Sequence, residues 1–437
     1  MPELPKGAIR RSVKVASLPA AYAGRAALGF GKRVGGKSAE SVAADIQQRT
    51  AEQMFKVFGE LKGGAMKFGQ AMSIFEAAMP EEFAAPYRET LTKLQDSAPP
   101  MEAARIHAIL ADELGSDWRS RFASFDDTPA AAASIGQVHR GVWHDGREVA
   151  IKVQYPGADK ALTADLNQIA RLGKMMSAWI PGMDVKPLIE ELKARMIEEL
   201  DYLQEADNQR AFANAYEGDA EVVVPHVVVS APHVLVSEWV EGIPLSAVIS
   251  AGTQEERDFA GTQYIRFLLS GPERAGLLHA DPHPGNYRIA ADGRFCALDF
   301  GAVSRLPGGL PLPLGTLLRV ADSGDAATVM EGLRQEGFIK PNITLDPEQL
   351  LNYLDPFVEP SRHERFTFTR EWMRGQFNRI NDFRDPDFTI GLKINLPPEY
   401  ALIHRVWLGG IGVLCQLGAT VPMRAELERW VPGYRAD

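Results

Sequence analysis

Lys152 closes a short apolar stretch, and its ammonium group could neutralise phosphate charge. The stretch Val149–Lys152 follows a turn at His144-Asp145-Gly146, which is itself preceded by the apolar run Gln137–Trp143. Asp-Gly between two apolar runs is typical of a β-hairpin, so we expect Lys152 to end the second strand. A single lysine at a strand end is more often an ordinary surface residue. Its meaning therefore depends on acidic and amide side chains elsewhere in the chain.

The segment His279–Asn286 carries an aspartate and an asparagine five positions apart. Asp281 could position or deprotonate an attacking hydroxyl group, and the amide oxygen of Asn286 could ligate a metal ion. We expect His279 to orient this segment rather than to react. A zinc site made of His279, Asp281 and His283 is the alternative, but no further ligand motif supports it.

A second carboxylate follows in Asp299-Phe300-Gly301, directly after the predicted strand 295–298. That strand and Tyr287–Ala290 flank Asp292-Gly293, which predicts another hairpin. A carboxylate at such a strand end can hold Mg²⁺ that bridges nucleotide phosphates. The tripeptide is common by chance, but its position 13 residues after Asn286, across a hairpin, is not. The motifs in this order predict an ATP or ADP site with Mg²⁺.

The elements that would position these residues change in type along the chain. Apolar residues repeat every three or four positions at 45–80, which predicts a long helix, and Ser97–Pro100 reads as a linker. Strands are expected at 130–153, at Val222–Val229 and at Val234–Val240, with helices at about 160–216. Glu241–Pro244 is expected to be a hinge, and the rest is mostly helical.

This order predicts an α+β, two-lobed fold with nucleotide bound between the lobes. The predicted units are a basic N-terminal tail at 1–38, a helical extension at 39–125, an N-lobe at 126–243 and a helical C-lobe at 244–437.

Composition narrows the class of protein. The chain has 437 residues, 45% of them hydrophobic and 24% charged, as in ordinary globular proteins. Cys296 and Cys415 cannot build a disulfide framework, which favours a reducing, cytoplasmic compartment. A net charge of −10 argues against nucleic-acid binding. The apolar run 406–421 contains Gln416 and is expected to be a buried core helix rather than a membrane span.

The N-terminal tail is an exception to the acidic balance. Residues 1–38 contain eight basic residues against Glu3 alone, with apolar residues between them. Such a tail could make a peripheral contact with the anionic inner face of a membrane, or it could be a solvated chain end. No uninterrupted apolar stretch follows it, so we do not expect a signal peptide.

Two further features bear on the nucleotide. A glycine-rich loop that contacts the phosphates is expected before the strand at 137–143, but this stretch is the alanine run at 130–133. Alanine cannot reach the positive φ angles open to glycine. Asp201 and Glu205 are four positions apart and would share a face of one helix, where they could pair with Lys152 and Lys67. A solvated acidic face is the ordinary alternative. In ordinary protein kinases an arginine at the position of Ala280 receives an activating phosphate. No motif typical of a peptide-substrate platform follows Asp299.

Together these residues resemble the UbiB/ADCK family of atypical, protein-kinase-like enzymes, in its AarF-type bacterial form, from about residue 50 onward. The resemblance implies catalytic roles for Lys67, Gln70, Lys152 and Asp281, and metal ligation by Asn286 and Asp299. It implies gating by Glu199 and Asp201, pairing of Glu205 with Lys152, and nucleotide contacts from residues that include Ala131, Ala132, Ala133, Ser134, Glu205 and Glu238. The sequence departs at Gly136, where many members have alanine, and it shows no paired C-terminal transmembrane helices like those of UbiB.

The resemblance implies an ATPase or small-molecule kinase of isoprenoid-quinone or membrane-lipid metabolism, with a lipid or small molecule as the substrate. A catalytically weak, nucleotide-sensing scaffold is the main alternative. The complete set of Lys152, Asp281, Asn286 and Asp299 would be unnecessary for such a scaffold. A protein serine/threonine kinase is the third hypothesis, and the missing activation signals disfavour it.

Overall fold

The computed structural model describes residues 101–133, 135–157, 200–381, 386–391 and 393–435. The segment Lys67–Gln70, Ser134 and Glu199 lie outside the described residues, as do the basic tail and the helix predicted at 45–80.

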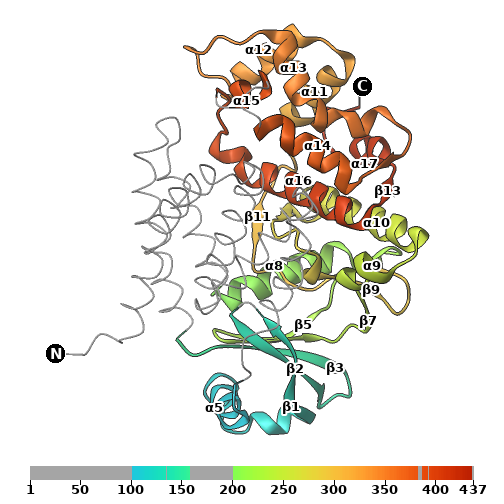
Figure 1. Cartoon of the computed structure of the whole chain (residues 1–437). Coiled ribbons are helices and arrows are strands. Elements are labelled where there is room, and N and C mark those ends of the chain that lie inside the picture. The colour runs from blue at the N-terminus through green and yellow to red at the C-terminus, as the bar shows by residue number, and fades with distance from the viewer. Residues whose placement is uncertain (1–100, 134, 158–199, 382–385, 392, 436–437) are drawn as a thin grey trace, which may run out of the picture.

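The first half of the described chain forms a five-stranded antiparallel sheet in the order β1-β2-β3-β6-β5 (Figure 1). Its strands are β1 (Phe122–Ala133), β2 (Gly136–Trp143), β3 (Glu148–Gln154), β5 (Val227–Ala231) and β6 (Val234–Glu238). The predicted hairpin of β2 and β3 is confirmed. β1 starts earlier than expected, and it therefore crosses residue 125, the predicted end of the helical extension.

One face of this sheet is covered by α5 (Ala103–Leu114) and the short helical turn η1 (Trp118–Arg121). The helix packs its buried apolar residues against Val149, Ile151 and Val153 of β3. Because side chains alternate along a strand, Lys152 must lie on the opposite face. Because α5 covers one face of the sheet, only the opposite face, which bears Lys152, can contribute to a reaction site.

The opposite face carries α8 (Tyr202–Ala215), which contacts β5 and β6. Tyr202 and Ala206 of this helix form a small buried cluster with Ile135 and Leu235. This packing orients the first two turns of α8 over the strand that bears Lys152.

The strand expected at Val222–Val229 is wrong as a single element. It is divided into β4 (Val222–Val223) and β5, and these strands belong to different sheets. Pro225 lies between them, and proline has no N–H to offer a continuous ladder. β4 pairs in parallel with β10 (Phe295–Ala297) of the C-lobe, so this segment ties the two lobes together.

The expected hinge at Glu241–Pro244 is also more ordered than predicted. Residues Gly242–Pro244 form β7, which pairs with β9 (Tyr287–Ala290). A Cβ on Gly242 would lie 2.3 Å from the carbonyl oxygen of Ile289, so only glycine permits this approach. The segment between the lobes is therefore hydrogen-bonded into the four-stranded sheet β4-β10-β9-β7.

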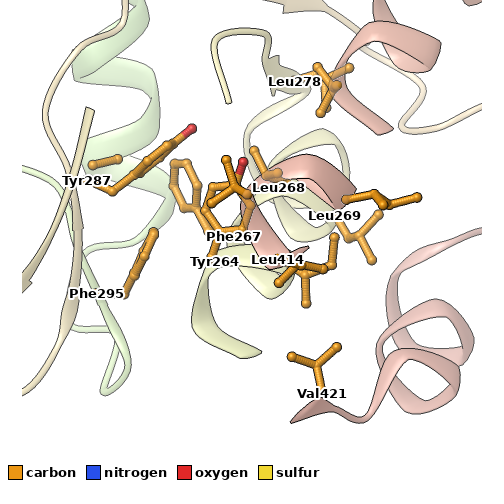
Figure 2. Close-up of a cluster of buried hydrophobic side chains, with 14 of the residues drawn as sticks. Tyr264, Phe267, Leu268, Leu269, Leu278, Tyr287, Phe295, Leu414 and Val421 are labelled. Atoms are coloured by element: carbon orange, nitrogen blue, oxygen red, sulfur yellow. The ribbon is translucent and has the colours of Figure 1, made fainter. Parts of the chain in front are cut away.

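The C-lobe is built around α10 (Gln254–Ala275), which begins with a capping box between Thr253 and Glu256. Its Tyr264, Phe267 and Leu268 pack against side chains from β9, β10 and α16 (Figure 2). The remaining elements here are α9 (Leu245–Ala251), β8 (Leu277–His279), η2 (Pro284–Asn286) and β11 (Val303–Arg305). The hairpin predicted around Asp292-Gly293 is confirmed as β9 and β10.

The chain then adds a helical end, opposite α5 and β1 in the molecule (Figure 1). Its helices are α11 (Leu312–Ser323), α12 (Ala326–Gln335), α13 (Pro347–Val358), α14 (Arg370–Asn381), α15 (Pro386–Gly391), α16 (Pro398–Leu417) and α17 (Met423–Trp430). Three short elements join them, η3 (Glu359–Arg362), β12 (Phe366–Thr367) and β13 (Thr420–Val421). α11, α12, α13 and α15 enclose an apolar core of their own.

Within the described residues, one helix is long and apolar enough to cross a membrane, at Glu399–Leu417. Of that window, 61% is buried within the protein. Val413, Leu414 and Leu417 have no exposed surface and belong to the C-lobe core. This agrees with the expectation of a buried core helix at this place. The mixture of helix and strand confirms the α+β, kinase-like fold class.

Candidate active site

Lys152 is the centre of a buried ion-pair cluster between the lobes. Its Nζ lies 2.7 and 2.8 Å from the two carboxylate oxygens of Glu205 on α8. The same ammonium donates to Oδ2 of Asp299 at 3.1 Å. The pairing of Lys152 with Glu205, which the family resemblance implies, is present. One lysine therefore connects β3, α8 and the residue that follows β10.

The charges in this cluster are strongly coupled. Burial on its own would lower the pKa of Lys152, but the Asp299 and Glu205 carboxylates outweigh it and hold that pKa well above its usual range. Burial raises the pKa of Glu205 to about 7, against the opposing effect of the Lys152 ammonium. Lys152 thus stays cationic at neutral pH, as a phosphate-binding group must.

Asp281 and Asn286 are held together by the backbone of the loop after β8. The carbonyl oxygen of Asp281 accepts from Asn286 Nδ2 at 3.3 Å and from the hydroxyl of Tyr287 at 3.1 Å. Since the amide nitrogen of Asn286 donates into the protein, its amide oxygen is the end suited to a metal ion. The backbone N–H of Leu298 donates to the carbonyl of Asn286 at 2.9 Å, which joins this loop to β10.

His279 links the Asp281 loop to Asp299. Its Nε2 lies 2.6 Å from the carbonyl oxygen of Asp299, and its Nδ1 lies 2.9 Å from the hydroxyl of Tyr287. A carbonyl can only accept, so Nε2 carries the proton, and the unprotonated Nδ1 shares the single hydroxyl proton of Tyr287 with the carbonyl oxygen of Asp281. Burial lowers the pKa of His279, which favours this neutral form. The geometry agrees with an orienting role for His279 and leaves neither ring nitrogen for zinc.

The metal site expected at Asn286 and Asp299 suits magnesium. No group of three or more His, Cys, Asp or Glu side chains within the described residues could hold a metal ion. Mg²⁺ prefers oxygen ligands, keeps several waters and completes its shell with substrate phosphates. An amide oxygen of Asn286 and the Asp299 carboxylate that pairs with Lys152 would therefore fit a magnesium–nucleotide complex better than a structural zinc.

Asp201 does not occupy the place predicted for it. We expected Asp201 and Glu205 to share a helix face, but Asp201 is the N-cap of α8, with φ at −96°. Its Oδ1 accepts from the backbone N–H groups of Leu203 and Gln204 at 3.1 and 3.0 Å. The carboxylate satisfies helix-end donors, so Glu205 alone of this pair contacts Lys152. The predicted partners Glu199 and Lys67, and with them Gln70, lie outside the described residues.

Glu238, expected among the nucleotide contacts, has its side chain elsewhere. It pairs with Val149 across β3 and β6, which places it on the sheet face opposite Lys152. Its carboxylate accepts from the backbone of His226 at 3.2 Å and lies 3.5 Å from Arg147. A contact between Glu238 and a nucleotide would therefore have to use the backbone.

The alanine-rich stretch is part of β1, and it extends the Lys152 face of the sheet. Ala131 is opposite Val138, and Val138 is opposite Lys152. Residues directly opposite in an antiparallel pair share a face, as do alternate residues such as Ala150. Small apolar side chains thus line the surface beside the lysine and could cover the flat face of a base. Sequence reasoning missed Val138, although its place in the strand alternation was visible. Ala132 and Ala133 continue the same strand towards Gly136.

Gly136 and Tyr202 pack closely against each other next to Lys152. A Cβ on Gly136 would lie 2.3 Å from the carbonyl oxygen of Val153 and 3.0 Å from the hydroxyl of Tyr202. The Tyr202 ring centre is 5.0 Å from the Lys152 ammonium. Its buried hydroxyl has no hydrogen-bond partner in the described part of the chain. The departure at Gly136 from the usual alanine is therefore matched by close packing, which sequence alone could not reveal.

Comparison with known proteins agrees with this geometry. The model of the ABC1 atypical kinase-like domain matches residues 93–332, more than half of the chain. The chain belongs to the ABC1 atypical kinase-like family. The matched range contains Lys152, Glu205, Asp281, Asn286 and Asp299, which confirms the resemblance inferred from the motifs.

Curated relatives of this ABC1 protein come from distant organisms. ACTIVITY OF BC1 COMPLEX KINASE 3 of Arabidopsis thaliana is 33% identical over 69% of this chain and 42% of its own length. The atypical kinase COQ8 of Saccharomyces cerevisiae is 28% identical over 91% of this chain and 79% of its own. This ABC1 chain spans about half the length of the first curated relatives that it matches, at 48, 42 and 54%.

A solved structure is also similar. Rv3197 of Mycobacterium tuberculosis, solved in complex with erythromycin, is 44% identical, with a TM-score of 0.70. The match covers 92% of this ABC1 chain and all of the mycobacterial one. The shared fold therefore extends beyond the matched domain into the helical end.

Proposed function

We propose that this chain binds Mg²⁺–ATP and catalyses ATP hydrolysis or phosphoryl transfer to a small molecule. The observation that supports this most directly is the convergence of Glu205 and Asp299 on Lys152. The backbone carbonyl of Asp281, which Asn286 contacts, is linked to the backbone of Asp299 through Tyr287 and His279. Lys152 neutralises the nucleotide phosphates, and Glu205 fixes its position. Asp281 positions or deprotonates the nucleophile.

Asn286 and Asp299 would hold the metal. A Mg²⁺ ion held there would supply positive charge to offset the negative charge that develops during transfer. The protein's part is then mostly positioning and electrostatic stabilisation. In this proposal Lys67 and Gln70 take part in catalysis, Glu199 gates access to the site, and the small apolar face at Ala131 and Val138 covers the base.

The acceptor that we propose is an isoprenoid quinone or another membrane lipid, on the strength of the resemblance to UbiB/ADCK enzymes. The basic tail would bring the protein to an anionic membrane surface, where such acceptors reside. The mycobacterial relative, solved with erythromycin, supports including a macrolide among the molecules tested.

The first experiment compares ATP turnover by the wild type and by Asp299→Asn, each with Mg²⁺ and with lipid vesicles. Asp207→Asn, at an exposed position on α8, is the matched control. We expect the Asp299 variant to lose most turnover and the control to keep it. Equal rates for all three proteins would defeat the proposal, whereas tight nucleotide binding without any product would favour the scaffold hypothesis.

A further inference from the structure

The helical end contains a cavity of about 310 Å³ that the nucleotide chemistry does not use. It lies among α11, α12, α13, α16 and the segment before α16, and none of its lining residues belongs to the Lys152 cluster. Figure 1 shows α11, α12 and α13 at the far end of the molecule from β1, β2 and β3. The cavity therefore needs an explanation of its own.

The walls of the cavity are mainly aliphatic. Ala321, Val329, Leu333 and Val358 line it, and each is less than a tenth exposed. Protein interiors rarely leave voids larger than a single water, which occupies about 30 Å³ of liquid. Water in a volume of this size would find few hydrogen-bond partners on such walls. The space is suited to an apolar ligand instead.

The described lining residues include no lysine, arginine, aspartate or glutamate. A charged headgroup would therefore find no counter-ion within the cavity, and burying one without a partner is costly. His404 lies in the wall, and burial lowers its pKa, so the ring is neutral at physiological pH. These observations indicate a ligand without net charge.

One apolar side chain of the wall is partly exposed. Leu396 lines the cavity and is 40% exposed, which marks a side where the cavity approaches solvent. A hydrophobic molecule could enter from this side.

We propose that this cavity binds the neutral hydrocarbon chain of a prenyl or acyl-chain alcohol or ester. The site is independent of the nucleotide chemistry proposed above. The chain fills the aliphatic part of the cavity.

The test is calorimetric titration of the full chain with farnesol, a branched prenyl alcohol, and with 1-dodecanol, a linear one. Ala321→Leu places three further carbons in the cavity, and Ala327→Leu adds the same side chain at an exposed position on α12. We expect affinity to fall at least tenfold in Ala321→Leu and to stay unchanged in Ala327→Leu. Stronger binding of one alcohol would identify the chain type.

Fluorescent-ATP binding by every variant checks that it is folded. Equal affinities of the wild type and Ala321→Leu, or no binding by the wild type, would overturn the proposal.

Discussion

The cluster around Lys152 and the cavity in the helical end use buried polar groups in opposite ways. At Lys152, ion pairs and backbone carbonyls connect residues far apart in the sequence, and His279 uses both ring nitrogens. At the cavity, Trp407 Nε1 is buried without a described partner, and the apolar walls do not close on each other. Fully partnered groups fix a geometry, whereas empty apolar volume leaves room for a ligand.

The two regions are joined by a short piece of chain. After Asp299 the chain forms β11, which pairs with β8, and seven residues after its end it enters the wall of the cavity at α11. A displacement of α11 could therefore be transmitted through β11 to Asp299. The predictions below separate the two regions by their response to substitution.

The largest effect is expected at Lys152. Replacing Lys152 by methionine removes the phosphate-binding charge and leaves Glu205 and Asp299 without their common partner. We expect ATP turnover to fall by about 100-fold or more, since loss of one preorganised charge typically costs that much. Steady-state phosphate release measures it, and Lys340→Met, at an exposed position, should match the wild type. A variant that keeps even a third of wild-type turnover would remove Lys152 from the mechanism.

Gly136→Ala should destabilise the region behind Lys152. Its Cβ would approach the carbonyl oxygen of Val153 to 2.3 Å, so β2 or β3 must shift. Overpacking of this kind costs about 1–3 kcal/mol. Thermal unfolding measures the change, and Gly375→Ala, where a Cβ meets nothing within 4 Å, is the control. Unchanged stability in Gly136→Ala would show that close packing does not explain this glycine.

Ala321→Leu should act in the opposite direction in the ligand-free protein. The added carbons fill empty apolar volume instead of meeting backbone, so we expect stability to rise by about 1 kcal/mol. Chemical denaturation measures this, with Ala327→Leu as the control. A loss of stability would mean that the walls cannot admit further atoms, which would weaken the contrast between the regions.

The smallest effect concerns acid. Because burial lowers the pKa of His279, the unfolded chain binds the proton more readily, and stability is lost as the pH falls through about 6.5. Between pH 7.5 and 5.5 the wild type should therefore lose up to about 1 kcal/mol more stability than His279→Asn. Denaturant titrations at both pH values measure this difference. Exposed His363, changed to asparagine, should leave the wild-type loss unaltered.

Much of the fold and of the site followed from local patterns. The two Asp-Gly hairpins formed as predicted, because a turn type and alternating apolar residues define a hairpin over about ten residues. Val222–Val229 was wrong as a single strand, since its halves pair with partners in different lobes and local pattern carries no record of that. The segment Glu241–Pro244, predicted to be a hinge, contains the strand β7, because its pairing with β9 is not encoded in the local pattern either.

The sequence by itself determined which groups are available: an ammonium at the end of an apolar strand, a carboxylate and an amide in one loop, and a carboxylate after the next hairpin. Only the tertiary structure decided which of them meet. The start of α8 makes Asp201 a cap and turns Glu205 towards Lys152, and the register of β3 and β6 turns Glu238 away. Such contacts join residues up to 147 positions apart, and they depend on packing that no local pattern encodes.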